Sequence, residues 1–167
     1  AYQARYDGLT DLPNRNYFSE QLEADIRHAI RHQQKFALLV LDLDHLREIN
    51  DVLGHEVGDA LLQRVAERIR TSIREDDLLA RIGGDEFAIV LRDLNDPSEA
   101  EIRAKAIMND LLHTLDIEHN HINMTASTGI AMFPHDGQEV QQLLKHAELV
   151  MYAAKAQGAM RVHFFGE

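Results

Sequence analysis

Short apolar runs alternate along the chain with stretches in which apolar residues recur at helical spacing, so the pattern predicts both strands and helices. Residues 36–41 are continuously apolar, which is typical of a strand covered on both faces. Two further apolar runs, 78–82 and 87–91, flank Gly83 and Gly84, and glycine tolerates the positive φ angles of a tight turn. These two runs therefore predict a β-hairpin.

Periodicity and capping signals predict the remaining elements. The first expected helix runs from Asn14 to about Gln33, and a short helical stretch ends at Val52. After a loop punctuated by Gly54 and Gly58, we expect a helix that carries Leu61, Val65 and Ile69. Asp96-Pro97-Ser98 opens the next helix, with Glu101 at capping-box spacing from Ser98, and the last helix spans Val140 to Ala154. Residues 121–133 and 162–165 predict two more strands. This order predicts an α+β fold with an antiparallel-rich sheet covered by helices. Nothing divides the chain, so we expect one domain over residues 1–167.

Composition narrows the classes of partner. The net charge of −11, without an evident basic face, argues against a nucleic-acid polymer and leaves a small metal-bound nucleotide as the favoured ligand. The absence of cysteine excludes disulfides and thiolate metal sites, and it fits a reducing compartment. No apolar run approaches the length of a membrane span.

Acidic residues stand where two of the predicted strands meet their turns. Asp42 and Asp44 close the run 36–41, and Asp85 and Glu86 lie on the rim of the hairpin turn. Carboxylates at a hairpin tip pack poorly and are good ligands for a hard cation. Mg²⁺ held by few protein ligands usually accompanies a phosphate substrate. The sequence thus predicts one Mg²⁺ site shared by the two strand ends, with a solvated acidic turn as the alternative.

Five blocks, in order along essentially the whole chain, resemble those of the GGDEF domain family, the diguanylate cyclases. They are Asp7-Gly-Leu-Thr-Asp-Leu-Pro-Asn-Arg15, the segment from Asp42 to Asp59, Gly83-Gly-Asp-Glu-Phe87, Ser127-Thr-Gly-Ile-Ala131, and Ala147-Glu-Leu-Val-Met-Tyr-Ala-Ala-Lys155. The first block departs from the family at Asp11, where a glycine is usual.

The resemblance implies a fold, a reaction and a set of neighbours. The fold is a palm-like α+β domain related to nucleotide cyclases and polymerases. The reaction condenses two GTP molecules into cyclic di-GMP and releases two pyrophosphates. Each domain would hold one GTP, so catalysis would require a second GGDEF domain in a transient homodimer.

The resemblance also assigns a metal and catalytic site to the two strand ends. Mg²⁺ or Mn²⁺ would be held by the carboxylates of Asp42 and Asp85 and by the backbone carbonyl of Leu43. A cation there would neutralise charge as a 3′-hydroxyl attacks an α-phosphate, and it would raise the acidity of that hydroxyl. Asp85 or Glu86 is expected to accept the proton. Asp44 is expected to support the site without binding the metal.

Substrate-binding residues follow from the same comparison. Asn50 and Asp59 match the guanine readers, because a carboxylate accepts from the N–H and amino edge of guanine and an amide suits its acceptors. From the sequence alone, Asp59 could instead cap the following helix. Arg47, where the family commonly has lysine, and Lys155 match residues that contact phosphates. Ala159 replaces a phosphate-contacting arginine that the family usually has.

A second ligand site is implied by Arg74 and Asp77. They form an RxxD string, with five residues between Asp77 and Gly83, which is the spacing of the family's inhibitory site for cyclic di-GMP. An arginine can stack on guanine or bind a phosphate, while the carboxylate binds a guanine edge. The alternative is a solvated helix terminus.

Two functions from different classes remain open. The first is a diguanylate cyclase, and the second is a catalytically weak module that binds GTP or cyclic di-GMP and regulates an attached domain. Ala159 favours the second. The tail 162–165 resembles GGDEF domains that continue into an EAL phosphodiesterase domain, and the chain starts abruptly at the first block. We therefore expect a domain excised from a longer cytoplasmic protein, or from the cytoplasmic part of a membrane-anchored one, with an attached sensory domain.

Overall fold

The computed structural model describes residues 2–158 and 162–166. Its helices are α1 (Tyr2–Arg5), α2 (Arg15–His32), α3 (Leu46–Leu53), α4 (His55–Ser72), α5 (Pro97–Leu111) and α6 (Val140–Ala156). Its strands are β1 (Lys35–Leu43), β2 (Leu78–Arg81), β3 (Glu86–Leu94), β4 (Leu115–Ile117), β5 (Asn120–Ile122), β6 (Ala126–Phe133) and β7 (Val162–Phe164). No helix in the described part of the chain is long and apolar enough to cross a membrane.

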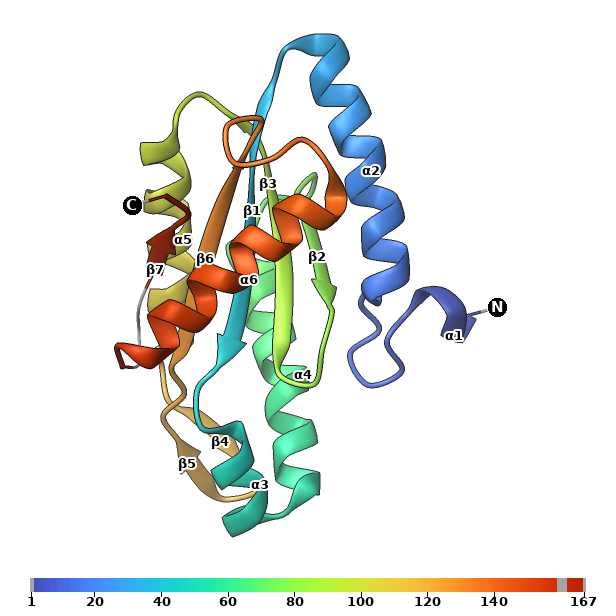
Figure 1. Ribbon diagram of the computed structural model, residues 1–167. Helices are drawn as coiled ribbons and strands as arrows, with labels where there is room; N and C mark the ends of the chain where they lie inside the picture. The colour runs from blue at the N-terminus through green and yellow to red at the C-terminus, as the bar shows by residue number, and fades with distance from the viewer. Residues whose placement is uncertain (1, 159–161, 167) are drawn as a thin grey trace.

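A five-stranded sheet in the order β2-β3-β1-β6-β7 forms the centre of the fold. All its pairs are antiparallel except β6 with β7, which run parallel. Helices cover both faces of the sheet, α2 and α6 on one and α4 and α5 on the other (Figure 1). The predicted α+β architecture is therefore confirmed.

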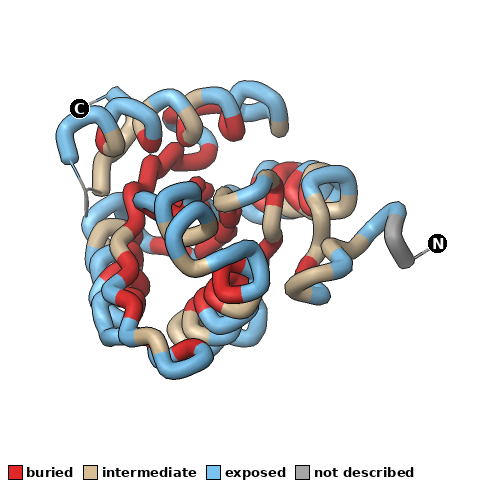
Figure 2. The backbone as a smooth tube through the Cα atoms, turned by 90° about the horizontal axis from the view of Figure 1, so that it is seen from below, coloured by how far each residue is buried: buried red, intermediate tan, exposed pale blue. Residues whose placement is uncertain are grey.

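The central strand β1 is buried on both faces because its side chains alternate between two apolar clusters. Leu39, Leu41 and Leu43 pack with residues of α4 and α5, whereas Leu38 and Val40 pack with residues of α2 and α6. Figure 2 shows buried residues gathered along the strands and on the inward sides of the helices. Since side chains alternate along a strand, Asp42 lies on the α6 face.

Helix α6 lies close to the sheet because β6 carries a glycine beneath it. A Cβ atom added to Gly129 would lie 2.1 Å from the carbonyl oxygen of Ala147 and 2.5 Å from the amide nitrogen of Met151. Both are backbone atoms of α6, so any side chain at this position would force the helix away. This close approach fixes the distance between the middle of α6 and the sheet.

Three local predictions were wrong. The predicted strand 121–133 is interrupted after Ile122, because β5 pairs with β4 in a separate hairpin. Gly58 lies inside α4, which begins directly after Gly54 at φ 96°. Helix α5 begins at Asp96-Pro97-Ser98 as predicted, but its N-cap is Asp96 rather than Ser98. The side chain of Asp96 accepts hydrogen bonds from the backbone of Ser98 and Glu99. Alternation of apolar residues is the same in either sheet, so it could not separate β5 from β6.

Candidate functional site

Strand register brings the acidic residues of two strands together at one end of the sheet. Asp42 on β1 lies opposite Glu86 on β3 and opposite Ser127 on β6. The amide of Leu43 donates to the carbonyl oxygen of Asp85 at 3.1 Å, so the hairpin turn is attached directly to the end of β1. The structure therefore places Asp42, Leu43, Asp85 and Glu86 side by side, as the sequence predicted.

A lysine from α6 contacts two of the three groups predicted to bind metal. The ammonium nitrogen Nζ of Lys155 lies 2.8 Å from Oδ2 of Asp42 and 3.3 Å from the carbonyl oxygen of Leu43. The other oxygen of Asp42, Oδ1, is buried without a hydrogen-bond partner among the described residues. The carboxylate of Asp42 and the carbonyl oxygen of Leu43 therefore converge on one position, which the Lys155 ammonium occupies.

The electrostatics of Asp42 also favour a cation. Burial raises the pKa of Asp42 to about 7, with a further upward contribution from Asp85, although the Lys155 ammonium acts against it. Burial by itself would lower the pKa of Lys155, but Asp42, Asp85 and Asp44 outweigh it and raise that pKa, so the ammonium is charged. The single ammonium only partly offsets the cost of a buried carboxylate, and a divalent cation would lower the pKa of Asp42 much further.

Asp44 has a structural task. It is buried, and its carboxylate accepts hydrogen bonds from the hydroxyls of Thr125 at 2.8 Å and Ser127 at 3.1 Å. Its amide donates to the carbonyl oxygen of Thr125 at 2.9 Å. These three bonds attach the end of β1 to the start of β6 and leave Asp44 outside the cation position, in the supporting role that the sequence predicted.

A cavity of about 300 Å³ opens beside Lys155 and joins the residues predicted to bind metal and phosphate. Leu43, Arg47, Asp85 and Lys155 are among the residues that line it. Arg47 is exposed on α3 and lines the cavity together with Lys155 of α6. Arg47 and Lys155 thus share one opening with three carboxylates, those of Asp44, Glu48 and Asp85, an arrangement that suits a metal-bound polyphosphate.

The predicted guanine readers lie on two helices that pack against each other, Asn50 on α3 and Asp59 on α4. Oδ1 of Asn50 is buried and has no partner among the described residues, and a Cβ atom on Gly58 would lie only 1.6 Å from it. Gly58 is therefore the residue that lets Asn50 occupy this place. Asp59 follows it on α4 and is exposed. Because Gly54 is the N-cap of α4, the alternative role of Asp59 as a helix cap is excluded.

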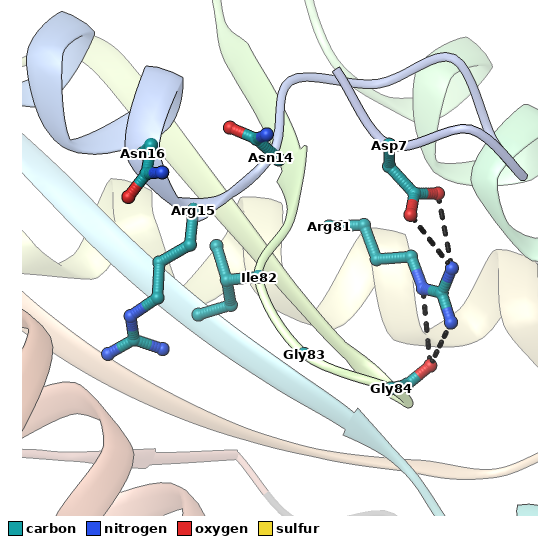
Figure 3. A pocket seen from close by; sticks show the side chains of 8 residues that line it. All are labelled: Asp7, Asn14, Arg15, Asn16, Arg81, Ile82, Gly83 and Gly84. Carbon is teal, nitrogen blue, oxygen red and sulfur yellow. Dashed lines mark hydrogen bonds and ion pairs between the residues drawn. The ribbon is translucent and has the colours of Figure 1, made fainter. Parts of the chain in front are cut away.

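The hairpin turn is held by a residue that sequence reasoning missed. Arg81 donates through Nη1 to both carboxylate oxygens of Asp7, at 3.0 and 3.1 Å, and through Nε and Nη2 to the carbonyl oxygen of Gly84, at 3.2 and 2.7 Å (Figure 3). Its guanidinium thus connects the N-terminal segment to the turn. The sequence does show an arginine just before the turn and an aspartate in the first block. Because the two residues are 74 positions apart, nothing in the sequence indicates that they pair.

Glu86 points to the α6 face, as the alternation along β3 requires. One of its oxygens, Oε1, is buried without a partner among the described residues. Burial raises its pKa, and the nearby carboxylates of Glu148 and Asp85 raise it further, while Arg15 and the hydroxyl of Tyr152 act in the other direction. A carboxylate with a raised pKa is a better proton acceptor than an ordinary one, which fits the predicted role of Glu86.

Residues 4–161 match the family described as diguanylate cyclase, GGDEF domain. The chain belongs to this family. It is 41% identical over 162 residues to MucR of Pseudomonas aeruginosa, a bifunctional diguanylate cyclase and cyclic di-GMP phosphodiesterase. The match covers 97% of the chain but 24% of MucR. The diguanylate cyclase TpbB of the same species is 40% identical, with 94% of this chain and 36% of TpbB covered.

Solved GGDEF domains share the fold over nearly their whole length. The isolated GGDEF domain of TpbB superposes with a TM-score of 0.93 at 37% identity, covering 96% of this chain and 94% of that one. The GGDEF domain of DgcB from Caulobacter crescentus, solved in complex with cyclic di-GMP, superposes with a TM-score of 0.89 at 28% identity, with 98% and 97% covered. The predicted family and palm-like fold are therefore confirmed.

In this GGDEF domain the predicted product site combines an exposed arginine with a buried aspartate whose carboxylate already has hydrogen-bond partners within the domain. Arg74 is exposed, and its Nη2 lies 3.9 Å from Oε1 of Glu99. The side chain of Asp77 is 1% exposed. It accepts from the backbone amides of Arg74 at 2.9 Å and Arg92 at 3.1 Å, and it pairs closely with the guanidinium of Arg103. Its carboxylate is fully engaged in this conformation, which a sequence string could not reveal. Ala159 lies outside the described residues.

Proposed function

We propose that this GGDEF domain is a diguanylate cyclase unit that binds GTP and condenses two such molecules into cyclic di-GMP and two pyrophosphates. The observation that carries the proposal is the convergence of Asp42, the carbonyl of Leu43 and Lys155 on one cation position beside Asp85. The naming of its relatives MucR and TpbB as diguanylate cyclases supports it. Because the chain spans 24% of MucR, the activity of a whole protein is also part of the proposal.

The metal is Mg²⁺ or Mn²⁺, held by the carboxylates of Asp42 and Asp85 and by the carbonyl of Leu43. These are oxygen ligands, and the buried unpartnered Oδ1 of Asp42 offers a free lone pair. When bound, the ion supplies positive charge at the α-phosphate and at the attacking oxygen. Arg47 and Lys155, which line the same cavity, bind the terminal phosphates.

Asn50 and Asp59 orient the guanine, and Glu86 or Asp85 accepts the proton of the attacking 3′-hydroxyl. The electrostatics of Glu86 suit this role, because burial and the carboxylate of Glu148 raise its pKa. One domain binds one GTP, so a second GGDEF domain must present the other GTP across the hairpin turn. The reaction therefore belongs to a transient homodimer.

The decisive experiment incubates the domain, fused to a dimerising segment, with GTP and Mg²⁺ and separates the nucleotides by chromatography. Wild type should form cyclic di-GMP at a rate per domain that rises with dimerisation, and Asp85→Asn should abolish it. Asp51→Asn, which removes an exposed carboxylate on α3, is the matched control and should keep the activity. If the dimerised wild type yields neither linear nor cyclic dinucleotide, the cyclase proposal is wrong.

A receptor role is the second candidate function, favoured by Ala159. The loss of one charged phosphate contact costs about 1.5–3 kcal/mol, or roughly tenfold to a hundredfold in binding or rate. Restoring the charge with Ala159→Arg separates the two functions. A gain in cyclase rate would identify the missing arginine as the cause of weak activity, and tight GTP binding without turnover in both forms would support the receptor.

We also propose that residues 1–167 form one domain of a longer protein. Its relatives MucR and TpbB are several times longer than the matched segment, and MucR is named as both a cyclase and a phosphodiesterase. Attached sensory and EAL domains are the proposed neighbours, and the cytoplasm is the proposed location. Limited proteolysis of the full-length protein should release this segment intact.

A further inference from the structure

The position of Lys155 does not fit a residue that only binds phosphate. Its ammonium lies 2.8 Å from Oδ2 of Asp42 and 3.3 Å from the carbonyl oxygen of Leu43. These two oxygens are two of the three groups to which the proposed function assigns the metal. Lys155 therefore contacts the metal oxygens directly.

An ammonium and a divalent ion cannot both lie between the carboxylate of Asp42 and the carbonyl oxygen of Leu43. Oδ1 of Asp42 is unpartnered, but Lys155 occupies Oδ2 and the carbonyl oxygen that the metal would also use. A magnesium ion binds oxygen at about 2.0–2.1 Å and needs the lone pairs that point at it. Lys155 directs N–H groups at the same lone pairs, and its positive charge would repel an ion placed between them. The side chain of Lys155 is 34% exposed, against 7% for Asp42, so the lysine can move away while the carboxylate stays fixed in β1.

The cavity beside Lys155 offers its ammonium a second position. Lys155 and Arg47 line the same cavity of about 300 Å³, next to Asp85. Lys155 belongs to the last turn of α6, and a lysine side chain has four flexible carbon–carbon bonds. A change of rotamer is therefore sufficient to carry its ammonium from the carboxylate of Asp42 into the cavity.

We propose that Lys155 is a stand-in cation that keeps the metal position neutralised in the nucleotide-free domain and is displaced when the metal binds. The displaced ammonium turns into the cavity and meets the phosphates that arrive with the metal. Lys155 thereby opposes binding of the metal alone and favours binding of the metal together with a triphosphate. This inference rests on the proposed metal site at Asp42 and Leu43.

The direct test measures Mn²⁺ binding to the domain without nucleotide, by calorimetry or by the electron paramagnetic resonance signal of free Mn²⁺. Lys155→Met removes the charge and keeps much of the apolar stem. It should bind Mn²⁺ about three- to tenfold tighter than wild type, since the competing half-buried ion pair is lost. Lys145→Met removes an exposed lysine from the same helix and should bind Mn²⁺ as wild type does.

A second measurement tests the other half of the inference. In the presence of saturating metal, Lys155→Met should bind GTP more weakly than wild type, although it binds Mn²⁺ alone more tightly. This opposite response of the two ligands is not expected from a lysine that merely supports the fold, which would weaken both.

The outcomes separate this inference from the proposed function. Asp42→Asn should remove Mn²⁺ binding in the wild-type and the Lys155→Met backgrounds; if it does not, the metal site itself is misassigned. If Asp42→Asn removes binding but Lys155→Met leaves the Mn²⁺ affinity unchanged or lower, the metal site is correct and the stand-in role is wrong. Absence of measurable Mn²⁺ binding to Lys155→Met would also overturn the inference, which requires this variant to bind the ion best.

Discussion

Replacing Arg81 by alanine should destabilise the domain markedly, because this one guanidinium holds two segments. The four hydrogen bonds of Arg81 reach both carboxylate oxygens of Asp7 and the carbonyl oxygen of Gly84. The side chains of Arg81 and Asp7 are 16% and 21% exposed, so the ion pair is largely shielded from water. The variant would leave a mostly buried carboxylate without its cation and a turn without its anchor.

The magnitude follows from those contacts. A hydrogen bond to a charged group contributes about 1.5–3 kcal/mol, and several bonds of one guanidinium are not additive. Partial exposure lowers the total, so we expect Arg81→Ala to cost about 2–4 kcal/mol in the free energy of unfolding. For a domain of this size that corresponds to a fall in Tm of about 5–15 °C. Arg27→Ala breaks an exposed pair with Glu23 and should cost about 0.3–0.5 kcal/mol.

The effect should depend on pH in a direction set by Asp7. Burial raises the pKa of Asp7, but the hydrogen bonds from Thr10 and the pairing with Arg81 outweigh it and hold that pKa below its ordinary value of 3.8. A carboxyl whose pKa is lower in the folded state adds stability above its unfolded pKa, and this stability is lost as the pH falls through the folded value. The difference in stability between wild type and Arg81→Ala should therefore narrow below about pH 4.

Urea unfolding at several pH values, followed by circular dichroism, measures both predictions. A double-mutant cycle with Asp7→Asn should give a coupling energy of about 1–2 kcal/mol at neutral pH. A loss for Arg81→Ala no larger than that for Arg27→Ala, or a stability difference that stays constant into acid, would refute the reasoning.

Three further predictions address the predicted ligand sites. Gly58→Ala should displace Asn50, because the new Cβ atom would lie 1.6 Å from Oδ1 of Asn50. The preference for GTP over ATP should then fall about tenfold in a displacement assay, and unchanged selectivity would contradict the guanine role. Asp77→Ala should lower the free energy of unfolding in urea by about 2–4 kcal/mol, since it leaves buried hydrogen-bond donors unpaired. Arg74 is exposed, so Arg74→Ala should lower it by less than about 1 kcal/mol, and equal losses would contradict the buried role of Asp77. Asp85→Asn should abolish the increase in GTP affinity that Mg²⁺ produces, and calorimetry with and without a chelator would show whether the increase persists.

The elements that the sequence predicted well are those with a strong local signal. The continuous apolar run of β1, the glycine turn and the amphipathic pattern of α6 each depend on residues close together in the chain. The short hairpin of β4 and β5 was missed because three-residue strands carry almost no periodic signal. Boundaries at Gly54 and Gly58 were missed because glycine marks both helix ends and close contacts between helices.

The candidate site likewise contains residues that the sequence could predict and contacts that it could not. Asp42, Asp85 and Glu86 could be predicted, since each stands at the end of a strong local element. The pairing of Asp77 with Arg103 could not be predicted, because that contact joins positions 26 residues apart and depends on how α5 packs against the sheet. Side-chain pairing across the fold is decided by tertiary geometry, which a motif string does not contain.

The register of β1 is the property on which the whole site depends. A shift of one residue relative to β3 and β6 would turn Asp42 to the α4 face and bring Leu43 beneath α6. Lys155 would then face a leucine, and the carboxylate would be buried in the apolar cluster of α4 and α5. Asp44 opposes this shift, because its three hydrogen bonds to Thr125 and Ser127 can form only in the present pairing. Its contribution to function is therefore to fix the strand that presents Asp42 to the cation.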